Sequence, residues 1–343
     1  MLDHPLARAA RAGALASRFI AADVGGTHAR VALVETVEGA GPRLHGFRRF
    51  TCAEHTDLGA LLGQFMHELP PELRGAEPPQ QAAIACAGYV LDRRLVHANL
   101  PWSVDLDQIE SDTGLREVRF VNDFEAVAIA VSRLPSTAME TVLAVEAASE
   151  GEAPLLVLGA GTGFGAALCV PMGGRLRVLA TEAGQAGFAP SSALGLELFA
   201  RFRHEQRQVN IEHFLSGPGL LRIYRGLCAL RGDAAVLQTP AAISAADAPH
   251  PRAQEAVELF CAELGSVCAN LVLSTGALGG VRLAGGVLPH LRPGLLRQGF
   301  REHFLDKGAM RAQLERVPVH LVEHGELGVL GAARWHLEQP QTR

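Results

Sequence analysis

The sequence Phe120-Val121-Asn122-Asp123-Phe124 places an amide and a carboxylate side by side between apolar residues. Burying both groups costs several kcal/mol unless each finds a partner. Asp123 could act as a general base that takes a proton from an attacking hydroxyl, while Asn122 binds a neighbouring hydroxyl. The structural alternative for Asp123 is a helix N-cap, where Asp is common. The stretch is therefore a candidate catalytic centre.

Two glycine-rich turns could bind phosphate. In the first, Asp23-Val24-Gly25-Gly26-Thr27, glycine allows unusual backbone angles that point amides into a phosphate-sized hollow, and Asp23 could hold Mg²⁺ through water. The second is Gly159-Ala160-Gly161-Thr162-Gly163-Phe164-Gly165. Its G-x-G-x-x-A subset would indicate a dinucleotide site only if it opened a helix, but the next residues, AALCVPMGG, are typical of a strand. The pair favours a phosphate clamp made of two facing hairpins, with ordinary hairpin turns as the alternative.

Two further stretches combine small residues with possible ligand contacts. In residues 178–190, VLATEAGQAGFAP, Glu182 and Gln185 stand among Ala and Gly, where a carboxylate could bind a polyol or a metal. A tight turn with a solvated Glu is the alternative. At Gly285-Gly286, the missing side chains would let a flat adenine lie against the backbone, and a tight turn explains the pair equally well.

The elements that must position these residues are predicted from hydrophobic periodicity and turn signals. Residues 19–35 and 155–170 each predict a strand, a glycine turn and a second strand. Further strands are expected over 43–52, 82–90 and 279–289, helices over 57–69 and through most of 191–274, and a strand followed by a helix over 118–134 and 318–338. Two halves that each open with a glycine-turned hairpin predict a duplicated α/β architecture with a ligand cleft between the lobes.

Composition excludes several classes of protein. The net charge of −5 without a basic, aromatic-rich stretch argues against nucleic acid. The six cysteines and 14 histidines show no zinc spacing, so we expect buried, free cysteines. Residues 153–174 are uncharged but contain too many Gly and Pro for a membrane span, and residues 1–18 lack a signal-peptide layout. Lys307 is the only lysine and lies outside any glycine-rich loop, which disfavours Walker A and Schiff-base chemistry.

The order of motifs identifies a family. D-V-G-G-T-H-A-R, F-V-N-D-F, G-A-G-T-G-F-G, a Glu before F-A-P, E-H-F-L-S-G-P-G-L, L-A-G-G-V-L-P and F-L-D-K-G follow one another between residues 19 and 335. The chain resembles the bacterial ATP-dependent glucokinase family, within the hexokinase, acetate kinase and actin ATPase-like superfamily. The resemblance implies a two-lobed actin-like ATPase (ribonuclease H-like) α/β fold around a cleft. The corresponding division is an N-terminal extension over 1–18, a small domain over 19–133 plus 324–343, and a large domain over 134–323.

The resemblance also implies the activity and the site residues. The expected reaction is transfer of phosphate from ATP to D-glucose or a related hexose, by a cytoplasmic homodimer with no nucleic-acid or membrane partner. Asp123 matches the catalytic base, and Mg²⁺ would travel with ATP, with Asp23 as the nearest carboxylate. The residues that match sugar ligands are Asn122, Asp123, Glu182 and Glu212. The residues that match ATP contacts are Ala22, Asp23, Val24, Gly25, Gly26, Thr27, Gly161, Thr162, Gly163, Gly285 and Gly286.

One loop departs from the family pattern. The family has a sequence close to G-E-G-G-H-x-x-F, whereas Thr181 to Phe188 reads T-E-A-G-Q-A-G-F. Gln185 replaces a sugar-binding His and is expected to bind the sugar with a different reach, and the methyl group of Ala183 is expected to crowd the site. Three alternatives therefore stay open: a kinase for another hexose or amino sugar, a weakly active sugar-binding regulatory protein, and a chaperone-like or cytoskeletal ATPase. The last is disfavoured because it would not need a polyol site.

Overall fold

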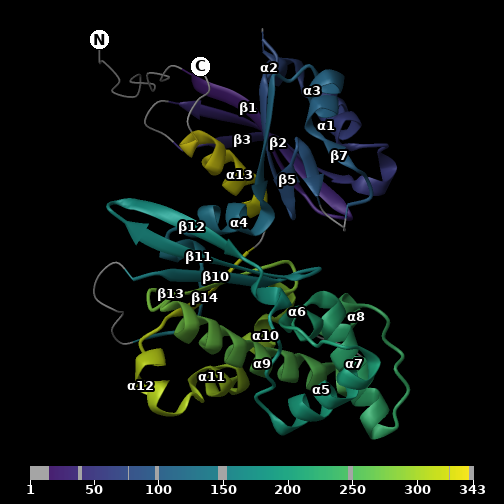
Figure 1. The fold of residues 1–343 in the computed structure, drawn as a ribbon, viewed down its shortest axis with the longest axis vertical. Helices are drawn as coiled ribbons and strands as arrows, with labels where there is room; N and C mark the ends of the chain where they lie inside the picture. The colour runs from purple at the N-terminus through teal and green to yellow at the C-terminus, as the bar shows by residue number, and fades with distance from the viewer. Residues whose placement is uncertain are drawn as a thin grey trace, which may run out of the picture. The chain divides into compact units, whose positions relative to one another are not determined.

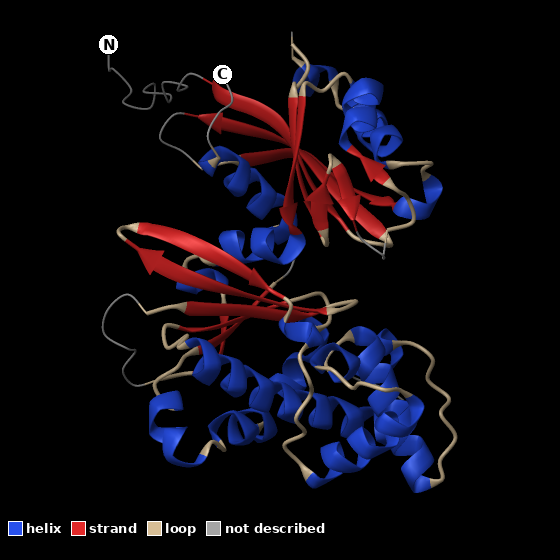
Figure 2. Cartoon of the chain, viewed as in Figure 1, coloured by secondary structure: helices blue, strands red, loops and turns tan. Residues whose placement is uncertain are grey.

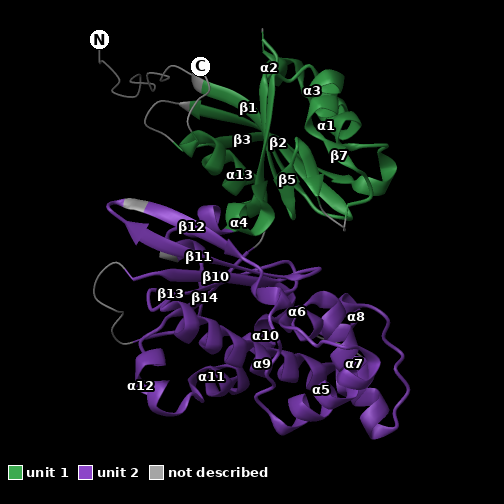
Figure 3. Ribbon diagram, in the orientation of Figure 1, with its two compact units in different colours: residues 1–127, 326–343 green, residues 128–325 purple. Residues whose placement is uncertain are grey.

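Two mixed β-sheets organise the chain, one in each of two units (Figures 1 and 3). The computed structural model describes residues 15–37, 41–75, 77–96, 100–145, 153–245, 250–323 and 325–339. Contacts within the chain group residues 1–127 and 326–343 into unit 1, and residues 128–325 into unit 2. The boundary between the units lies inside helix α4 (Asp123–Val131), whereas the sequence analysis placed it after residue 133.

Unit 1 contains a five-stranded sheet in the order β3-β2-β1-β4-β8. Its strands β1, β2 and β3 form an antiparallel meander, and β4 and β8 run parallel to β1. The predicted hairpin over residues 19–35 is confirmed. The strand bounds are β1 (Leu15–Val24), β2 (His28–Val37), β3 (Arg43–Thr51), β4 (Gln81–Cys86) and β8 (Glu117–Asn122).

Strand β1 begins earlier than the sequence analysis predicted. Residues 15–18 belong to the strand and not to an N-terminal extension, while residues 1–14 lie outside the described residues. Cross-strand contacts explain the longer strand, because the hydroxyl oxygens of Ser17 and Thr36 are 2.7 Å apart and Arg18 Nε lies 3.3 Å from Glu35 Oε1.

The expected single strand over residues 82–90 is two strands. β4 ends at Cys86, Gly88 adopts a φ of 102°, and the chain resumes as β5 (Tyr89–Leu91). β5 pairs with β6 (Arg94–Val96), which pairs with β7 (Val104–Asp105), and these three form a separate small sheet. A φ near +100° is accessible to glycine but strained for other residues, so Gly88 turns the chain out of the first sheet.

Helices cover both faces of the main sheet of unit 1 (Figure 2). On one face, α1 and α3 contribute Leu61 and Ile109 to an apolar core. On the other, α13 packs Val329 and Ala332 against Phe19 and its neighbours. The bounds are α1 (Leu58–Glu68), α2 (Pro71–Arg74), α3 (Leu106–Thr113) and α13 (Leu327–Glu338), with a 3₁₀ turn at Cys52–Glu54.

A histidine is buried within this second core. His336 on α13 is 3% exposed and its ring centroid lies 4.3 Å from that of Phe19. Its Nε2 lies 3.2 Å from Gln81 Oε1, and its Nδ1 has no hydrogen-bond partner among the described residues. Burial, and to a lesser extent the charge of Arg119, lowers the pKa of His336 to about 4, although Glu117 opposes the shift. The ring is therefore neutral in the folded protein near pH 7.

This burial predicts a loss of stability in mild acid. An unfolded His takes up a proton near pH 6.5, whereas folded His336 resists it down to about pH 4, so the free energy of unfolding should fall as the pH drops through this window. Between pH 7 and 5 the loss is about 1 to 2 kcal/mol, the lower figure allowing for solvent screening. Urea unfolding at the two pH values should show a smaller loss for His336→Gln, which does not titrate. Equal losses for wild type and variant would contradict this origin.

Unit 2 contains a six-stranded sheet in the order β12-β11-β10-β13-β14-β9. Its β10, β11 and β12 form an antiparallel meander, and β13 and β14 extend the sheet parallel to β10. This repeats the topology of unit 1 and adds the antiparallel edge strand β9. The bounds are β9 (Glu140–Leu143), β10 (Leu155–Ala160), β11 (Phe164–Met172), β12 (Arg175–Thr181), β13 (Gly280–Ala284) and β14 (Val319–Val322).

A helical layer packs against the sheet of unit 2, with α9 at its centre (Figure 1). Length and apolar composition would let α9 cross a membrane, but 72% of its most apolar window is buried in the protein. The α-helices are α5 (Ala193–Glu205), α6 (Ile211–Phe214), α7 (Gly217–Arg231), α8 (Pro240–Ser244), α9 (Pro251–Thr275), α10 (Arg292–Leu295), α11 (Gln298–Leu305) and α12 (Arg311–Leu314). Short 3₁₀ turns occur at Ser136–Ala138, Ala183–Gln185, Leu288–Leu291 and Gly308–Met310.

The cysteines match the prediction from their spacing. All six are free and buried, at positions 52, 86, 169, 228, 261 and 268. Burial raises the pKa of Cys169 to about 12 and also raises that of Cys52, which keeps both thiols protonated and unreactive at neutral pH.

Candidate active site

The first glycine turn, Ala22 to Thr27, joins β1 to β2 in unit 1. Ala22 and Val24 point into the core, so their side chains are not available to a ligand. Gly25, Gly26 and Thr27 are exposed, and the N–H of Gly25 donates to the carbonyl of His28 at 3.0 Å.

Gly25 in the first turn acts differently from the prediction. Its φ lies outside the left-handed region, so the expectation that glycine supplies unusual backbone angles is wrong for Gly25; Gly161 and Gly163 in the second turn also keep φ outside that region. A Cβ at Gly161 would meet nothing within 4 Å. What glycine provides there is an open backbone that a phosphate could approach closely.

Asp23 is the one ionisable group in the first turn. Its Oδ2 accepts from Arg30 Nη1 at 3.2 Å, and a Cβ at Gly328 would lie 2.5 Å from its Cγ. Burial raises the pKa of Asp23, and Arg30 partly offsets the rise. The described residues contain no group of three or more His, Cys, Asp or Glu side chains that could hold a metal. Arg30 contacts only Oδ2 of Asp23, so Oδ1 is left for another ligand. A single carboxylate of this kind fits the usual Mg²⁺ site of a phosphate-binding enzyme, in which substrate phosphates and water supply most ligands.

Asn122 and Asp123 lie where β8 passes into α4. Asn122 Oδ1 accepts from the N–H groups of Phe124 at 3.0 Å and Glu125 at 3.1 Å, so Asn122, and not Asp123, caps the helix. Asp123 is the first residue of α4, and its Oδ1 accepts from the N–H of Phe124 at 2.8 Å. Because both lone-pair directions of Asn122 Oδ1 are used, Asn122 can offer a ligand only its amide N–H donors.

The two candidate site carboxylates of unit 1, Asp23 and Asp123, lie at the carboxyl ends of two parallel strands. Val24, Cys86 and Asn122 are register partners at the carboxyl ends of three parallel strands. Cys86 lies close to both Asp123 and Asp23. The pKa of its thiol is raised to about 12, mainly by burial and further by the charges of these two carboxylates. The structure therefore brings the predicted base and the predicted Mg²⁺ residue to the same end of these strands.

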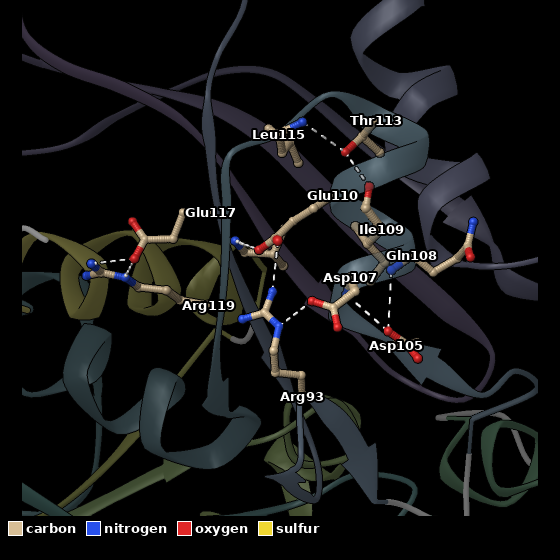
Figure 4. Close-up of polar contacts among 11 residues, drawn as sticks. Arg93, Asp105, Asp107, Gln108, Ile109, Glu110, Thr113, Leu115, Glu117 and Arg119 are labelled. Carbon is tan, nitrogen blue, oxygen red and sulfur yellow. Dashed lines mark hydrogen bonds and ion pairs between the residues drawn. The ribbon is translucent and has the colours of Figure 1, made fainter.

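Helix α3 holds strand β8 in place (Figure 4). Glu110 on α3 accepts from the N–H of Val118 at 3.0 Å with one oxygen and from Arg93 Nη2 at 2.8 Å with the other. Asp105 caps α3 by accepting from the N–H groups of Asp107 and Gln108. This support fixes the strand whose end carries Asn122 and Asp123.

The second glycine turn belongs to unit 2 and joins β10 to β11. Gly161 donates to the carbonyl of Gly163 at 2.8 Å and accepts from the N–H of Gly217 at 2.8 Å. Gly285 is packed on this turn, since a Cβ there would lie 2.5 Å from the carbonyl oxygen of Ala160. Gly285 is therefore required for packing, while Gly286 is exposed and a Cβ there would meet nothing within 4 Å.

The loop with the altered family pattern is a 3₁₀ turn after β12. Glu182 and Gln185 are exposed, and the N–H of Gln185 donates to the carbonyl of Glu182 at 3.0 Å. Gly184 leaves no room for a side chain, because a Cβ would lie 2.3 Å from the carbonyl oxygen of Phe164. Ala183 packs against the apolar core of unit 2. Its methyl group thus contacts that core, and the expected crowding of the site stays a prediction.

Glu212 links the sugar-ligand candidates to the second glycine turn. Its Oε2 accepts from the N–H of Phe164 at 2.9 Å, and a Cβ at Gly163 would lie 2.5 Å from the same oxygen. Glu212 stands in the first turn of α6, which Asn210 caps by accepting from the N–H of His213 at 2.8 Å. The predicted polyol-binding carboxylate and the predicted phosphate-binding turn are therefore in direct contact within unit 2.

Asn210 contacts a candidate site residue, and the sequence alone did not single it out. Its Nδ2 donates to Gln185 Oε1 at 2.7 Å. The backbone N–H of His213 can only donate, so it fixes Oδ1 of Asn210 as acceptor and Nδ2 as donor, and Gln185 must turn its Oε1 toward Asn210. Gln185 consequently presents N–H donors to solvent. The available signal was an Asn directly before the short segment I-E-H-F, a typical N-cap position.

Comparison with known proteins agrees with these features. The family Glucokinase matches residues 20–339. A glucokinase-like protein of Xylella fastidiosa (strain 9a5c) is 42% identical, over 94% of this chain and 96% of its own length. The glucokinase of Zymomonas mobilis subsp. mobilis is 34% identical, over 92% of this chain and 96% of its own length.

A solved glucokinase structure is also similar to this chain. The crystal structure of a glucokinase from an Antarctic psychrotroph matches with a TM-score of 0.78 and 30% identity, and covers 94% of this chain and 99% of that one. The predicted actin-like ATPase α/β fold is confirmed. With its strand topology, its two glycine turns and a family match over nearly its whole length, the chain belongs to the glucokinase family of sugar kinases.

Proposed function

We propose that the protein transfers the γ-phosphoryl group of ATP to the 6-hydroxyl of a hexose, with D-glucose as the leading substrate. The observation that carries this proposal is the contact between Glu212 and the Gly161–Gly163 turn, which sets a polyol-binding carboxylate beside open phosphate-binding backbone. Relatives named glucokinase at 31 to 34% identity support the choice of sugar. Exposed backbone turns suit phosphoryl transfer, which depends on positioning and charge neutralisation more than on covalent catalysis.

In unit 1, Asp123 would accept the proton of the 6-hydroxyl. The sugar oxygen forms a bond to the γ-phosphorus, the bond from that phosphorus to the β–γ bridging oxygen breaks, and ADP leaves with the electron pair. Asn122 would donate an N–H to a neighbouring hydroxyl oxygen, since its own oxygen is engaged in capping α4. The backbone of residues 22–27 would bind phosphate, and Asp23 would hold Mg²⁺ through water. Mg²⁺ would neutralise phosphate charge during the transfer.

In unit 2, the exposed carboxylate of Glu182 and the carboxylate of Glu212 would accept from sugar hydroxyls, while Gln185 would donate to a sugar oxygen. The turn of Gly161, Thr162 and Gly163 would bind phosphate through the N–H groups of Thr162 and Gly163, since that of Gly161 donates to the carbonyl of Gly163. Gly285 and Gly286 would lie along the adenosine. We further propose that the enzyme works as a cytoplasmic homodimer.

A coupled ADP-release assay with glucose, mannose, fructose, glucosamine and N-acetylmannosamine tests the proposal. Turnover with glucose as the preferred sugar is the expected result. Turnover only with another sugar would identify a kinase for that hexose or amino sugar, an alternative that Gln185 favours because its N–H donors replace an imidazole. Sugar binding by calorimetry without turnover on any of the five would reject a kinase and leave a regulatory sugar-binding protein.

The donor role of Gln185 makes a sharp prediction. Gln185→Glu keeps an oxygen for Asn210 Nδ2 and converts only the exposed donor into an acceptor. The KM for the sugar should rise at least about tenfold, because a carboxylate cannot donate and the sugar hydroxyl must turn its single O–H toward it, losing the acceptor to which it donated; the KM for ATP stays unchanged. Steady-state kinetics with each substrate varied in turn measures both values.

A variant of a neighbouring residue separates the loss of the Gln185 donor from the effect of an added negative charge. Gln208→Glu adds the same charge at an exposed neighbour, whose Nε2 donates only weakly to the carbonyl of Gln185 at 3.4 Å. It should change the sugar KM by less than about threefold, as expected for an exposed charge. If Gln185→Glu left the sugar KM unchanged, Gln185 would not be a sugar ligand.

A further inference from the structure

One fully buried carboxylate has no part in the chemistry proposed above. Glu263, in the middle of α9, is 0% exposed. It accepts four hydrogen bonds, from the backbone N–H and hydroxyl of Ser191, both at 2.8 Å, and from the N–H and hydroxyl of Ser192 at 3.2 and 2.7 Å. Four donors match the acceptor capacity of an ionised carboxylate.

The neighbours of Glu263 provide a positive charge close to its carboxylate and the space that the carboxylate occupies. Lys307, the only lysine of the chain, donates to Ser266 one turn further along α9 at 2.8 Å, and its charge interacts with Glu263. A Cβ at Gly195 would lie 2.1 Å from Glu263 Oε1, so glycine there leaves room for the carboxylate. His303 Nδ1 lies 2.7 Å from the Ser191 hydroxyl and completes the contacts of that side chain.

The segment that Glu263 holds follows directly on the loop of Glu182 and Gln185. Residues 186–188 pair with residues 209–211: Ile211 donates to the carbonyl of Ala186 at 3.0 Å, and Phe188 donates to that of Val209 at 3.1 Å. The partner segment carries Asn210, which orients Gln185, and leads directly into Glu212 on α6. The ring centroids of Phe188 and Phe214 stack at 4.0 Å and reinforce the pairing.

The loop is thus anchored at both ends. Before it, the Thr181 hydroxyl donates to the carbonyl of Ala166 at 2.8 Å; after it, Ser191 and Ser192 are fixed by Glu263. Ser192 also caps α5 by accepting from the N–H of Gly195 at 2.9 Å. A loop ordered before the ligand arrives does not lose that conformational entropy on binding.

From these contacts we infer that Glu263 is a positioning residue that pre-orders the sugar-binding loop of unit 2, an inference that rests on the proposed function. Glu263 acts through Ser191 and Ser192 on Glu182, Gln185 and Glu212. Its contribution is to sugar affinity and not to the transfer step. The proposed ATP-contacting turn at Gly161–Gly163 has a second anchor, because Gly161 accepts from the N–H of Gly217, and Glu212 contacts only its Gly163 end.

Glu263→Gln is the decisive variant. The hydroxyls of Ser191 and Ser192 can rotate and accept from the new amide, but one of the two backbone N–H groups must then face an N–H donor. The expected result is a sugar KM raised by about tenfold, with kcat and the KM for ATP within about twofold of wild type. Glu258→Gln is the matched control, since Glu258 lies on the same helix, is exposed and pairs with Arg297, and it should leave all three constants unchanged.

Two further measurements keep the inference open to rejection. If Glu263→Gln does not fold, Ser191→Ala removes one hydroxyl bond to Glu263 and keeps the backbone bond, and the sugar KM should rise by about threefold. The positioning role would be overturned if folded Glu263→Gln, or in its place folded Ser191→Ala, had the sugar KM of wild type. It would also be overturned if kcat fell while the sugar KM stayed unchanged. Wild-type enzyme that phosphorylates no hexose would instead reject the proposed function.

Discussion

Replacing Asp123 by Asn is expected to lower kcat by about 10²- to 10⁴-fold, the usual range for loss of a general base. The change is local, because the amide oxygen of Asn can still accept the hydrogen bond from the N–H of Phe124, which Asp123 Oδ1 now accepts at 2.8 Å. Asn122 remains as the cap of α4. The variant therefore removes the proton acceptor without removing the helix start that positions it.

Binding and turnover must be measured separately for this variant. Calorimetry should show ATP affinity within about threefold of wild type, because Asp123 is proposed to contact the sugar and not the nucleotide. Asp112→Asn is the control: Asp112 is an exposed carboxylate of the same unit that accepts from Gln108 Nε2, and its variant should keep wild-type turnover. Turnover of Asp123→Asn within tenfold of wild type would remove Asp123 from the role of base.

Local signals in the sequence were sufficient for most of the fold. The two hairpins over 19–35 and 155–170 alternate apolar residues around glycine turns, and both form as predicted. The expected strand over 82–90 failed because Gly88 takes a positive φ, and a lone glycine does not reveal this in advance. Residues 15–18 are held by Thr36 and Glu35 on the neighbouring strand, which is information from outside the segment.

Contacts between distant segments, which the sequence does not reveal, matter even more in the candidate site. Asn122 and Asp123 are both good capping residues, so sequence alone could not assign the cap; the structure gives it to Asn122. The roles of Asn210 and Glu263 depend on partners 25 and 72 residues away. Such polar contacts leave no periodic pattern, because each one depends on how separate elements pack.

Replacing Gly331 by Ala is expected to destabilise the protein by at least about 2 kcal/mol, although Ala is the better helix former. In a helix interior Gly→Ala normally stabilises by about 1 kcal/mol. At Gly331, however, a Cβ would lie 1.8 Å from the carbonyl oxygen of Ala126 and 2.3 Å from its carbon. Both atoms belong to the backbone of α4, which cannot rotate away as a side chain could, so overpacking outweighs propensity.

Gly63→Ala on α1 is the control of opposite sign, because a Cβ there meets nothing within 4 Å and the variant should be more stable by about 0.5 to 1 kcal/mol. Urea unfolding measures both changes.

Since α4 begins at Asp123, any shift of α4 that accommodates the added methyl group also moves the proposed base. The value of kcat per folded molecule should therefore fall for Gly331→Ala but not for Gly63→Ala. A Gly331→Ala protein as stable as Gly63→Ala would mean that α13 does not pack against α4 at this contact. A destabilised variant with normal kcat would mean that the packing is correct but that Asp123 tolerates displacement of its helix.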